Sequence, residues 1–173
     1  MAIDLNHLND YFIALQNLLP KNSKLSLAKS FHLTLKFLGD VQPDNAEKII
    51  NILKDIKFQQ FSVFLDSIGV FPSESCIRVI WLGIKPEGNI LKLQNIIDDS
   101  LKHLFKKERD FKAHVTLARV KNLEDKKSLI EQLKKIQVEN VKFEIKDFRL
   151  IKSTLTPKSP IYEDLMRFNL DNF

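Results

Sequence analysis

Cysteine, histidine and long hydrophobic runs are all scarce in this chain. The single cysteine, Cys76, excludes an internal disulfide, and no CxxC pair exists, which is typical of a reducing compartment. No apolar stretch approaches the roughly 20 residues that a membrane-spanning helix needs. The first residues lack the basic start and apolar core of a secretory signal peptide. We therefore expect a cytoplasmic protein that does not cross a membrane.

The motifs of several large enzyme classes are also missing. The sequence contains no HExxH, no pair of histidines four residues apart and no cysteine cluster, which argues against a metal site. It contains no GxSxG turn, P-loop or GxGxxG, which argues against a serine hydrolase and against a nucleotide as energy source. We expect neither a metal nor another cofactor.

What is present is an ordinary globular composition with an excess of positive charge. The 173 residues are 44% hydrophobic and 28% charged, which fits one domain over residues 1–173. The formal net charge of +5 attracts an anionic partner such as RNA, although many equally basic proteins bind no nucleic acid. We expect a monomer.

Strand and helix patterns alternate along the chain, and no linker or low-complexity segment separates them. The predicted strands are Ala2–Leu5, Lys24–Leu27, Phe31–Leu38, Phe61–Phe71, Ile77–Lys85, Ala113–Val120, Val141–Leu150 and Leu165–Leu170. The predicted helices are His7–Leu19, Pro43–Ile56, Ile90–Phe105 and Leu123–Ile136.

One short pattern occurs twice. Phe31–Leu35 reads FHLTL and Ala113–Leu117 reads AHVTL, and each copy lies in a predicted strand between two predicted helices. Two related halves, each contributing one His-x-Thr strand to a common groove, would explain the repetition. We therefore predict an α+β fold with two lobes and largely antiparallel sheets.

The two copies carry the side chains that phosphoester chemistry needs. Side chains alternate between the faces of a strand, so His32, Thr34 and Lys36 share one face, as do His114 and Thr116. An imidazole has an ordinary pKa of about 6.5, so one histidine can accept a proton while the other donates one. The threonine hydroxyls, with Lys36 nearby, are candidates for phosphate binding. A single His-x-Thr is usually an ordinary strand feature, but two matching copies among four histidines favour a catalytic pair.

These residues resemble those of a known family. His32–Gly39 (HLTLKFLG) and His114–Val120 (HVTLARV) match the twin motifs of the 2H phosphoesterase superfamily. More narrowly, the chain is similar to the bacterial and archaeal RNA 2',3'-cyclic phosphodiesterases, also described as 2'-5' RNA ligases. Further similar segments are Ala2–Asp4, Gly69–Pro72, Arg78–Gly83, Ser153–Pro157 and Pro160–Glu163.

The resemblance implies a bilobed 2H phosphoesterase fold, with two pseudo-symmetric lobes, antiparallel sheets lining a central groove and helices outside. It implies metal-independent opening of a 2',3'-cyclic phosphate at an RNA end to leave a 2'-phosphate. His32 would be the proton donor, His114 the proton acceptor, and Arg119 a phosphate ligand. Strict alternation places Arg119 on the face opposite His114, so either a β-bulge re-aims it, or the strand ends there, or Arg119 is an ordinary surface residue. Related members also join tRNA halves through a 2'-5' linkage, so tRNA halves are a further expected partner.

Two alternatives stay open. The chain could be a 2H hydrolase of small cyclic nucleotides, or a non-catalytic RNA-binding module whose histidines only position phosphate. Tyr162 and Phe37 are candidates for stacking on a base, although Phe37 fits the core better.

Overall fold

The computed structural model describes residues 1–21, 23–156 and 160–171 of the chain. The strands are β1 (Ala2–Asp4), β2 (Lys24–Leu27), β3 (His32–Thr34), β4 (Phe61–Ser73), β5 (Cys76–Lys85), β6 (His114–Asn122), β7 (Lys142–Ile145), β8 (Asp147–Thr154) and β9 (Ile161–Asn169). The helices are the 3-10 helix η1 (Asn6–Leu8) and the α-helices α1 (Asn9–Asn17), α2 (Pro43–Lys54), α3 (Glu87–Ser100) and α4 (Lys126–Leu133). Pro157, in one of the segments that resemble the family, lies outside the described residues.

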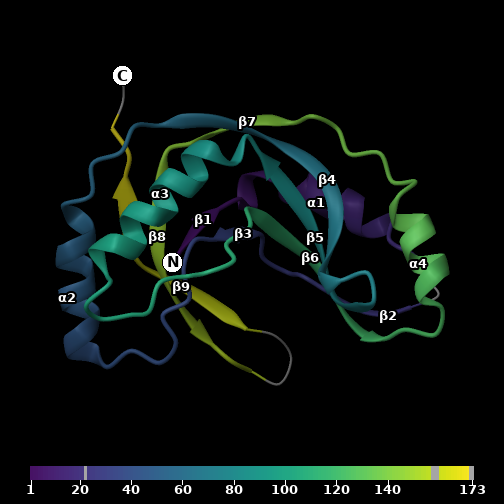
Figure 1. The fold of residues 1–173 in the computed structure, drawn as a ribbon, viewed down its shortest axis with the longest axis horizontal. Coiled ribbons are helices and arrows are strands. Elements are labelled where there is room, and N and C mark those ends of the chain that lie inside the picture. Colours follow the sequence, from purple (N-terminus) through teal and green to yellow (C-terminus); the bar gives the residue numbers. More distant parts are fainter. Residues whose placement is uncertain (22, 157–159, 172–173) are drawn as a thin grey trace.

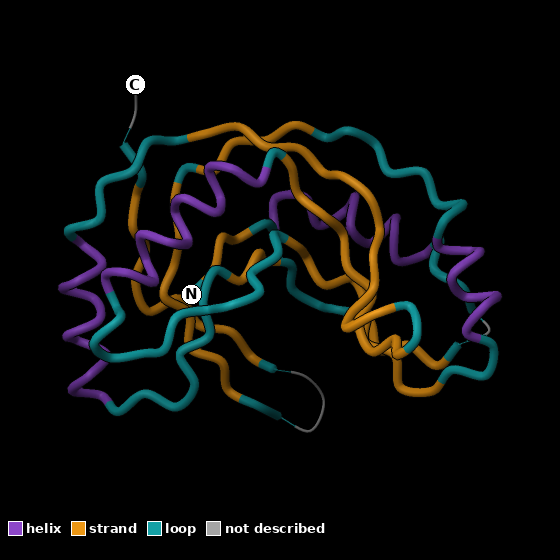
Figure 2. The backbone as a smooth tube through the Cα atoms, in the orientation of Figure 1, coloured by secondary structure: helices purple, strands orange, loops and turns teal. Residues whose placement is uncertain are grey.

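The nine strands of the described residues form one antiparallel sheet in the order β7-β4-β5-β6-β3-β1-β8-β9, with β2 paired to β6. The strands that carry the two motifs, β3 and β6, are neighbours at its centre. The sheet therefore consists of a first half, β3-β1-β8-β9, and a second half, β6-β5-β4-β7. Figures 1 and 2 show it bent into an arch, with the β8–β9 and β4–β5 hairpins on either side. The predicted bilobed, antiparallel α+β fold is confirmed.

The helices lie on the outside of this arch. Helix α1 packs against β6, and α2 packs against α3 and β9. Helix α4 covers the outer end of the second half (Figure 1), where the ammonium of Lys126 donates to the Ser75 carbonyl at 2.9 Å. No helix in the described part of the chain is long and apolar enough to span a membrane.

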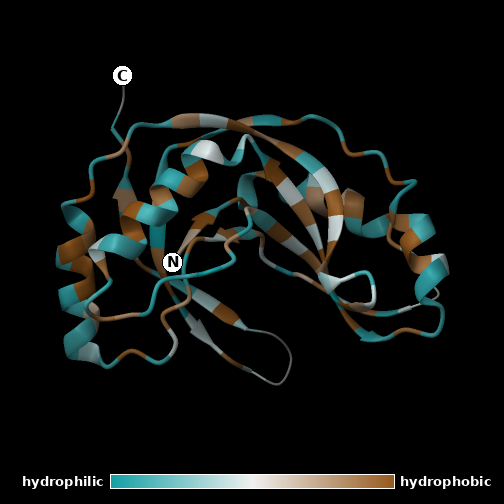
Figure 3. Cartoon of the chain, in the orientation of Figure 1, coloured by the Kyte–Doolittle hydropathy of each residue, from teal (hydrophilic) through white to brown (hydrophobic). Residues whose placement is uncertain are grey.

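Local sequence explains where several helices begin. Pro43 occupies the first turn of α2, where its fixed φ suits a helix and its missing N–H costs no hydrogen bond. Asp125 caps α4 by accepting a hydrogen bond from the Ser128 N–H at 2.9 Å. The hydrophobic bands along β4, β5 and the helices (Figure 3) meet in one core, in which Leu33 and Val115 of the two motif strands are fully buried.

The prediction of one strand over Val141–Leu150 is wrong, because this stretch belongs to two strands. β7 pairs with β4 in the second half, whereas β8 pairs with β1 and β9 in the first half. The change shows in the burial pattern: Phe143 and Ile145 are buried, and then Phe148 and Leu150. The alternation thus shifts by one residue at Lys146, where the chain passes from one half to the other.

Most other elements agree in type and differ at their ends. The predicted strand Phe31–Leu38 is shortened to β3, and the predicted strand Leu165–Leu170 is part of the longer β9. The predicted helix Ile90–Phe105 corresponds to α3, which begins and ends earlier.

Four polar side chains are buried among the described residues: Gln16, Lys36, Gln94 and Asp98. They lie at two contacts, one between α1 and β6 and one between α3 and the segment just after β3. From α1, Gln16 Nε2 donates to the Leu117 carbonyl of β6 at 2.8 Å and to the Ala28 carbonyl at 2.9 Å. From α3, Asp98 forms an ion pair with Lys36, just beyond β3. Each motif strand is therefore braced against a helix by buried polar contacts.

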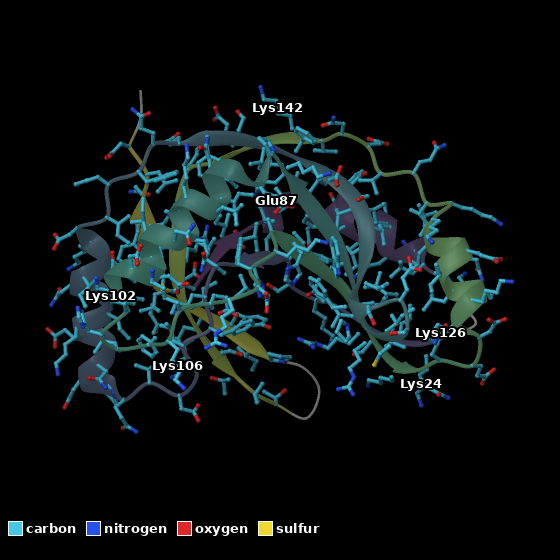
Figure 4. The ribbon with its side chains drawn as sticks, viewed as in Figure 1. Lys24, Glu87, Lys102, Lys106, Lys126 and Lys142 are labelled. Atoms are coloured by element: carbon cyan, nitrogen blue, oxygen red, sulfur yellow. The ribbon has the colours of Figure 1, made fainter. Side chains whose placement is uncertain are left out.

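The Lys36–Asp98 pair is completed by backbone and side-chain partners. The Lys36 ammonium also donates to the carbonyl of Lys106, a residue labelled in Figure 4, at 2.7 Å. Asp98 accepts from Gln94 Nε2 at 2.8 Å and from the Glu108 N–H at 2.9 Å. Burial by itself would raise the pKa of Asp98, but these hydrogen bonds and the Lys36 charge hold it below its usual range.

Replacing Lys36 by methionine should destabilise the protein strongly. The substitution leaves the Asp98 carboxylate buried without its cation, which typically lowers the free energy of unfolding by about 3–5 kcal/mol. The matched control is Lys85→Met, which removes an exposed ion pair with Asp66 and should cost less than about 1 kcal/mol. Urea unfolding of both variants measures the difference. Equal, small effects would contradict the bracing role of the buried pair.

Candidate active site

The two motif strands lie side by side, and their register brings the motifs together. Leu33 of β3 pairs with Val115 of β6 in antiparallel orientation. Partners in an antiparallel pair run in opposite directions, so His32 lies opposite Thr116 and Thr34 lies opposite His114. Directly opposite residues point to the same face of a sheet. The four motif side chains therefore share one face, here called the motif face, while Leu33 and Val115 point into the core.

This arrangement has approximate two-fold symmetry around the Leu33–Val115 pair. Each histidine has a threonine directly across from it and the other histidine on the diagonal. Diagonal neighbours in antiparallel strands are about 7–8 Å apart, so the imidazoles can approach a phosphoryl group from opposite sides. Both histidines are half-buried, and the charge of His114 acts on His32 across the strand pair.

The ring of His114 is fixed by a hydrogen bond and by two aromatic rings. Its Nδ1 lies 2.8 Å from the carbonyl oxygen of Lys112, and because a carbonyl only accepts, Nδ1 carries the hydrogen. The ring centroids of Phe71 and Trp81 lie 4.8 and 6.1 Å away. Burial lowers the pKa of His114; the hydrogen bond to Lys112 opposes this change and the Lys112 charge adds to it.

His32 has different surroundings. Its ring is 5.0 Å from that of Tyr162 on β9, and Asp4 of β1 lies directly opposite it in the register. Burial lowers the pKa of His32. The positive charge of the N-terminus and His114 add to this effect, and the negative charge of Asp4 opposes it.

A β-bulge places Arg119 on the motif face. Ile80 pairs with Ala118 and the next residue, Trp81, pairs with Thr116, so Leu117 is the extra residue on β6. Leu117 and Ala118 are both buried, and Arg119 is exposed. The Gln16 amide and the Ala28 N–H both bind the Leu117 carbonyl, which holds the bulge. Because the bulge adds one residue to the strand, the side chain of Arg119 points to the same face as those of His114 and Thr116.

Lys36 does not reach the motif face, contrary to the sequence-based prediction. β3 ends at Thr34, and Leu35 and Lys36 are both buried, so the alternation shifts there as well. Lys36 is 2% exposed and engaged by Asp98 and the Lys106 carbonyl. The next residue, Phe37, was expected in the core but is 78% exposed. Both expectations relied on strict alternation beyond the end of the strand.

Sequence reasoning missed several residues that surround the histidines. Asp4, Phe71 and Trp81 come from three separate segments, and the pairing of β1 with β3, of β5 with β6 and of β4 with β5 brings them close. Lys112 Nζ lies 4.3 Å from the centroid of the Trp81 ring. Two residues did have a signal in the sequence: alternation puts Lys112 on the face of His114, and Asp4 lies in the segment Ala2–Asp4 that resembles the family. The described residues contain no cluster of three or more metal-ligating side chains of the kinds His, Cys, Asp and Glu.

Gly69→Ala should disturb the aromatic support of His114. A Cβ at Gly69 would lie 2.2 Å from Trp81 Cζ2, and the indole is stacked on Phe71, so it has little freedom to move. We expect a lower free energy of unfolding by about 1–3 kcal/mol and altered fluorescence of Trp81, the single tryptophan. Gly88→Ala is the matched control, because a Cβ there meets nothing within 4 Å. Unchanged stability and fluorescence of Gly69→Ala would contradict the tight contact.

The chain is similar to known proteins in sequence. The model of the family "LigT like Phosphoesterase" matches residues 5–81 and again residues 82–162. An RNA 2',3'-cyclic phosphodiesterase of Methanocaldococcus jannaschii is 41% identical over 145 residues, covering 83% of this chain and 82% of the relative. A protein of the same name from Archaeoglobus fulgidus is 39% identical over 142 residues, covering 81% of this chain and 80% of the relative.

Solved structures share the fold across nearly the whole chain. A Thermus thermophilus protein superposes with a TM-score of 0.80 at 23% identity, covering 97% of this chain and 94% of the other. Escherichia coli LigT complexed with 3'-AMP gives a TM-score of 0.73 at 23% identity, covering 98% and 95%. The resemblance indicated by the paired His-x-Thr motifs agrees with the family match and with the identity of the relatives. The chain belongs to the LigT-like phosphoesterase family.

Proposed function

We propose that this protein hydrolyses the terminal 2',3'-cyclic phosphate of RNA to a 2'-phosphate, with His32 as proton donor and His114 as proton acceptor. The observation that carries the proposal is the register of β3 and β6, which puts both His-x-Thr pairs on one face. The RNA substrate is supported by the relatives named RNA 2',3'-cyclic phosphodiesterase and by the net charge of +5.

In the proposed reaction a water oxygen attacks the phosphorus as the bond from phosphorus to the 3' oxygen breaks. Neutral His114 takes the proton of the water, and protonated His32 gives its proton to the departing 3' oxygen. The products are a 2'-phosphate and a 3'-hydroxyl. Afterwards His114 is protonated and His32 is neutral, and exchange with solvent restores both. No step of this scheme uses a metal.

The tautomer of His114 supports its role as the acceptor. With its hydrogen on Nδ1, directed at the Lys112 carbonyl, the neutral ring has a free lone pair on Nε2. The ring orientation is maintained by Phe71 and Trp81, so the base does not have to be ordered when substrate binds.

The phosphate would be held by the remaining groups of the motif face. Hydroxyls of Thr34 and Thr116 can donate to the non-bridging oxygens, on which negative charge accumulates in the transition state. The guanidinium of Arg119, re-aimed by the bulge at Leu117, can donate to two phosphate oxygens at once. Lys36 is left out of this role, because its ammonium is bound by Asp98.

The terminal base has two candidate contacts beside the proton donor. Tyr162 lies against His32, next to the ribose that carries the leaving oxygen, and the exposed ring of Phe37 follows the first motif.

Ligation of tRNA halves, in which a 5'-hydroxyl replaces the water, stays a prediction, as do the monomeric state and the cytoplasmic location. Hydrolysis of a small cyclic nucleotide is the main alternative, and non-catalytic RNA binding the other.

An RNA oligonucleotide with a 2',3'-cyclic phosphate end should be converted to the 2'-phosphate in the presence of EDTA. Removing either proton-transfer group typically costs on the order of 10²–10⁴ in rate, so His32→Ala and His114→Ala should both be severely impaired. Phosphorus NMR of the product assigns the position of the phosphate. His103→Ala, which removes an exposed histidine outside both motifs, is the matched control and should retain activity.

The same assay separates the alternatives. Hydrolysis that falls steeply with salt and with shortening of the oligonucleotide indicates an RNA substrate, because RNA binding releases counterions. Comparable turnover of a cyclic mononucleotide at all salt concentrations indicates the small-molecule alternative. An unreacted end, with binding that survives both alanine substitutions, indicates a binding module and contradicts the proposed hydrolysis.

The pH dependence of kcat/KM should be bell-shaped and displaced toward acid. Burial lowers the pKa of both imidazoles from their ordinary value of 6.5, and the reaction needs His32 protonated and His114 neutral. Activity should therefore fall at low pH as His114 gains a proton, and fall with rising pH, beginning below pH 6.5, as His32 loses one. Initial rates measured across this range at constant ionic strength test the expectation. A rate that rises steadily into alkali would exclude a histidine as the acid.

A further inference from the structure

The two motif histidines are matched in sequence but differ in the charges beside them. His32 lies directly across from Asp4, and paired residues of neighbouring strands point to the same face. His114 lies across from Gly83 on β5, and the charged side chain that acts on it is the cation Lys112. A carboxylate stabilises the protonated form of a neighbouring imidazole, whereas an ammonium favours its neutral form.

Asp4 is held in place by groups next to His32. Its Oδ1 accepts a hydrogen bond from Asn6 Nδ2, and Asn6 Oδ1 accepts one from the N–H of Phe31 at 3.1 Å. Phe31 directly precedes His32, so Asn6 ties the carboxylate to the backbone of the first motif. The other oxygen, Oδ2, lies 3.3 Å from Nη2 of Arg149 on β8. Both oxygens of Asp4 are thus engaged, and its influence on His32 is exerted through charge.

The charges around Asp4 leave a negative excess beside His32. Arg149 is shared by three carboxylates, those of Asp4, Asp147 at 3.1 Å and Asp164 at 2.6 Å. Arg167 binds the other oxygen of Asp147 at 2.6 Å. Two guanidinium groups face three carboxylates, so the cluster carries one uncompensated negative charge. Arg149 therefore orients Asp4 without cancelling the field of the cluster.

We propose that Asp4 is a positioning residue that keeps His32 in its protonated, proton-donating form. The proposal rests on the proposed function in one respect, the assignment of His32 as donor. Among the described residues, the titratable and charged groups that face His32 are Asp4 from β1, the N-terminal amino group, His114 from β6 and Tyr162 from β9. Burial lowers the pKa of the amino group to about 5. Asp4 is the carboxylate of this set, so it sets which of two similar histidines is the acid.

Asp4→Asn should lower the pKa of His32 and leave that of His114 unchanged. Histidine proton NMR of the folded, substrate-free protein reads both titrations, with His32→Ala and His114→Ala assigning the signals. Because the donor form becomes rarer, kcat/KM at about pH 8 should fall roughly threefold to tenfold, while the rate on the acid side stays the same. Asp164→Asn is the matched control: it removes another carboxylate of Arg149 that does not lie across from His32, so it should lower the pKa of His32 clearly less.

A second variant tests the same idea with the opposite sign. Arg149→Gln removes the positive charge beside Asp4, so the pKa of His32 should rise. It also decides the matter if Asp4→Asn does not fold. An unchanged His32 titration in both variants, or equal shifts in Asp4→Asn and Asp164→Asn, would overturn the proposal. Because the titration needs no substrate, it remains decisive even if the RNA end is not hydrolysed and the proposed function fails.

Discussion

The pairing of β3 with β6 through Leu33 and Val115 is the constraint on which the rest of this structure depends. Because side chains alternate with a period of two, a slip of one residue would turn one His-x-Thr pair into the core and bury its histidine. The buried partners Leu33 and Val115 oppose such a slip, since either would then face solvent. The packing of the hydrophobic face of the two strands thus determines which side chains lie together on the motif face.

Buried polar contacts with two helices hold the β3–β6 pair in place. Gln16 of α1 binds the bulge of β6, and Asp98 of α3 binds the end of β3, so each motif strand is fastened to a helix that precedes the other motif. Apolar packing alone tolerates small displacements, whereas a buried amide or ion pair loses its partners when the strands shift. This difference accounts for polar groups being placed at these two junctions.

The sequence was sufficient to predict the twin strands from local alternation, and the antiparallel two-lobed fold from the repeated His-x-Thr pattern and the family resemblance. It was not sufficient where alternation fails. The bulge at Leu117 brings Arg119 to the motif face, and the end of β3 takes Lys36 away from it, although strict alternation predicted the reverse for both residues. Asp4 and Phe71 could not be assigned at all, since only the strand order places them beside a histidine. The parity change from Ile145 to Phe148 was visible in the sequence and would have predicted two strands.

We propose above all that His32 donates a proton to the leaving oxygen while His114 activates the nucleophile. A cyclic substrate with sulfur in place of the 3' oxygen tests it directly, because a thiolate leaves without protonation. The kcat/KM of wild type, His32→Ala and His114→Ala would be compared on the oxygen and sulfur substrates. The account predicts that sulfur restores most of the activity of His32→Ala and none of that of His114→Ala. Equal impairment of both variants on the sulfur substrate, or rescue of His114→Ala instead, would contradict it.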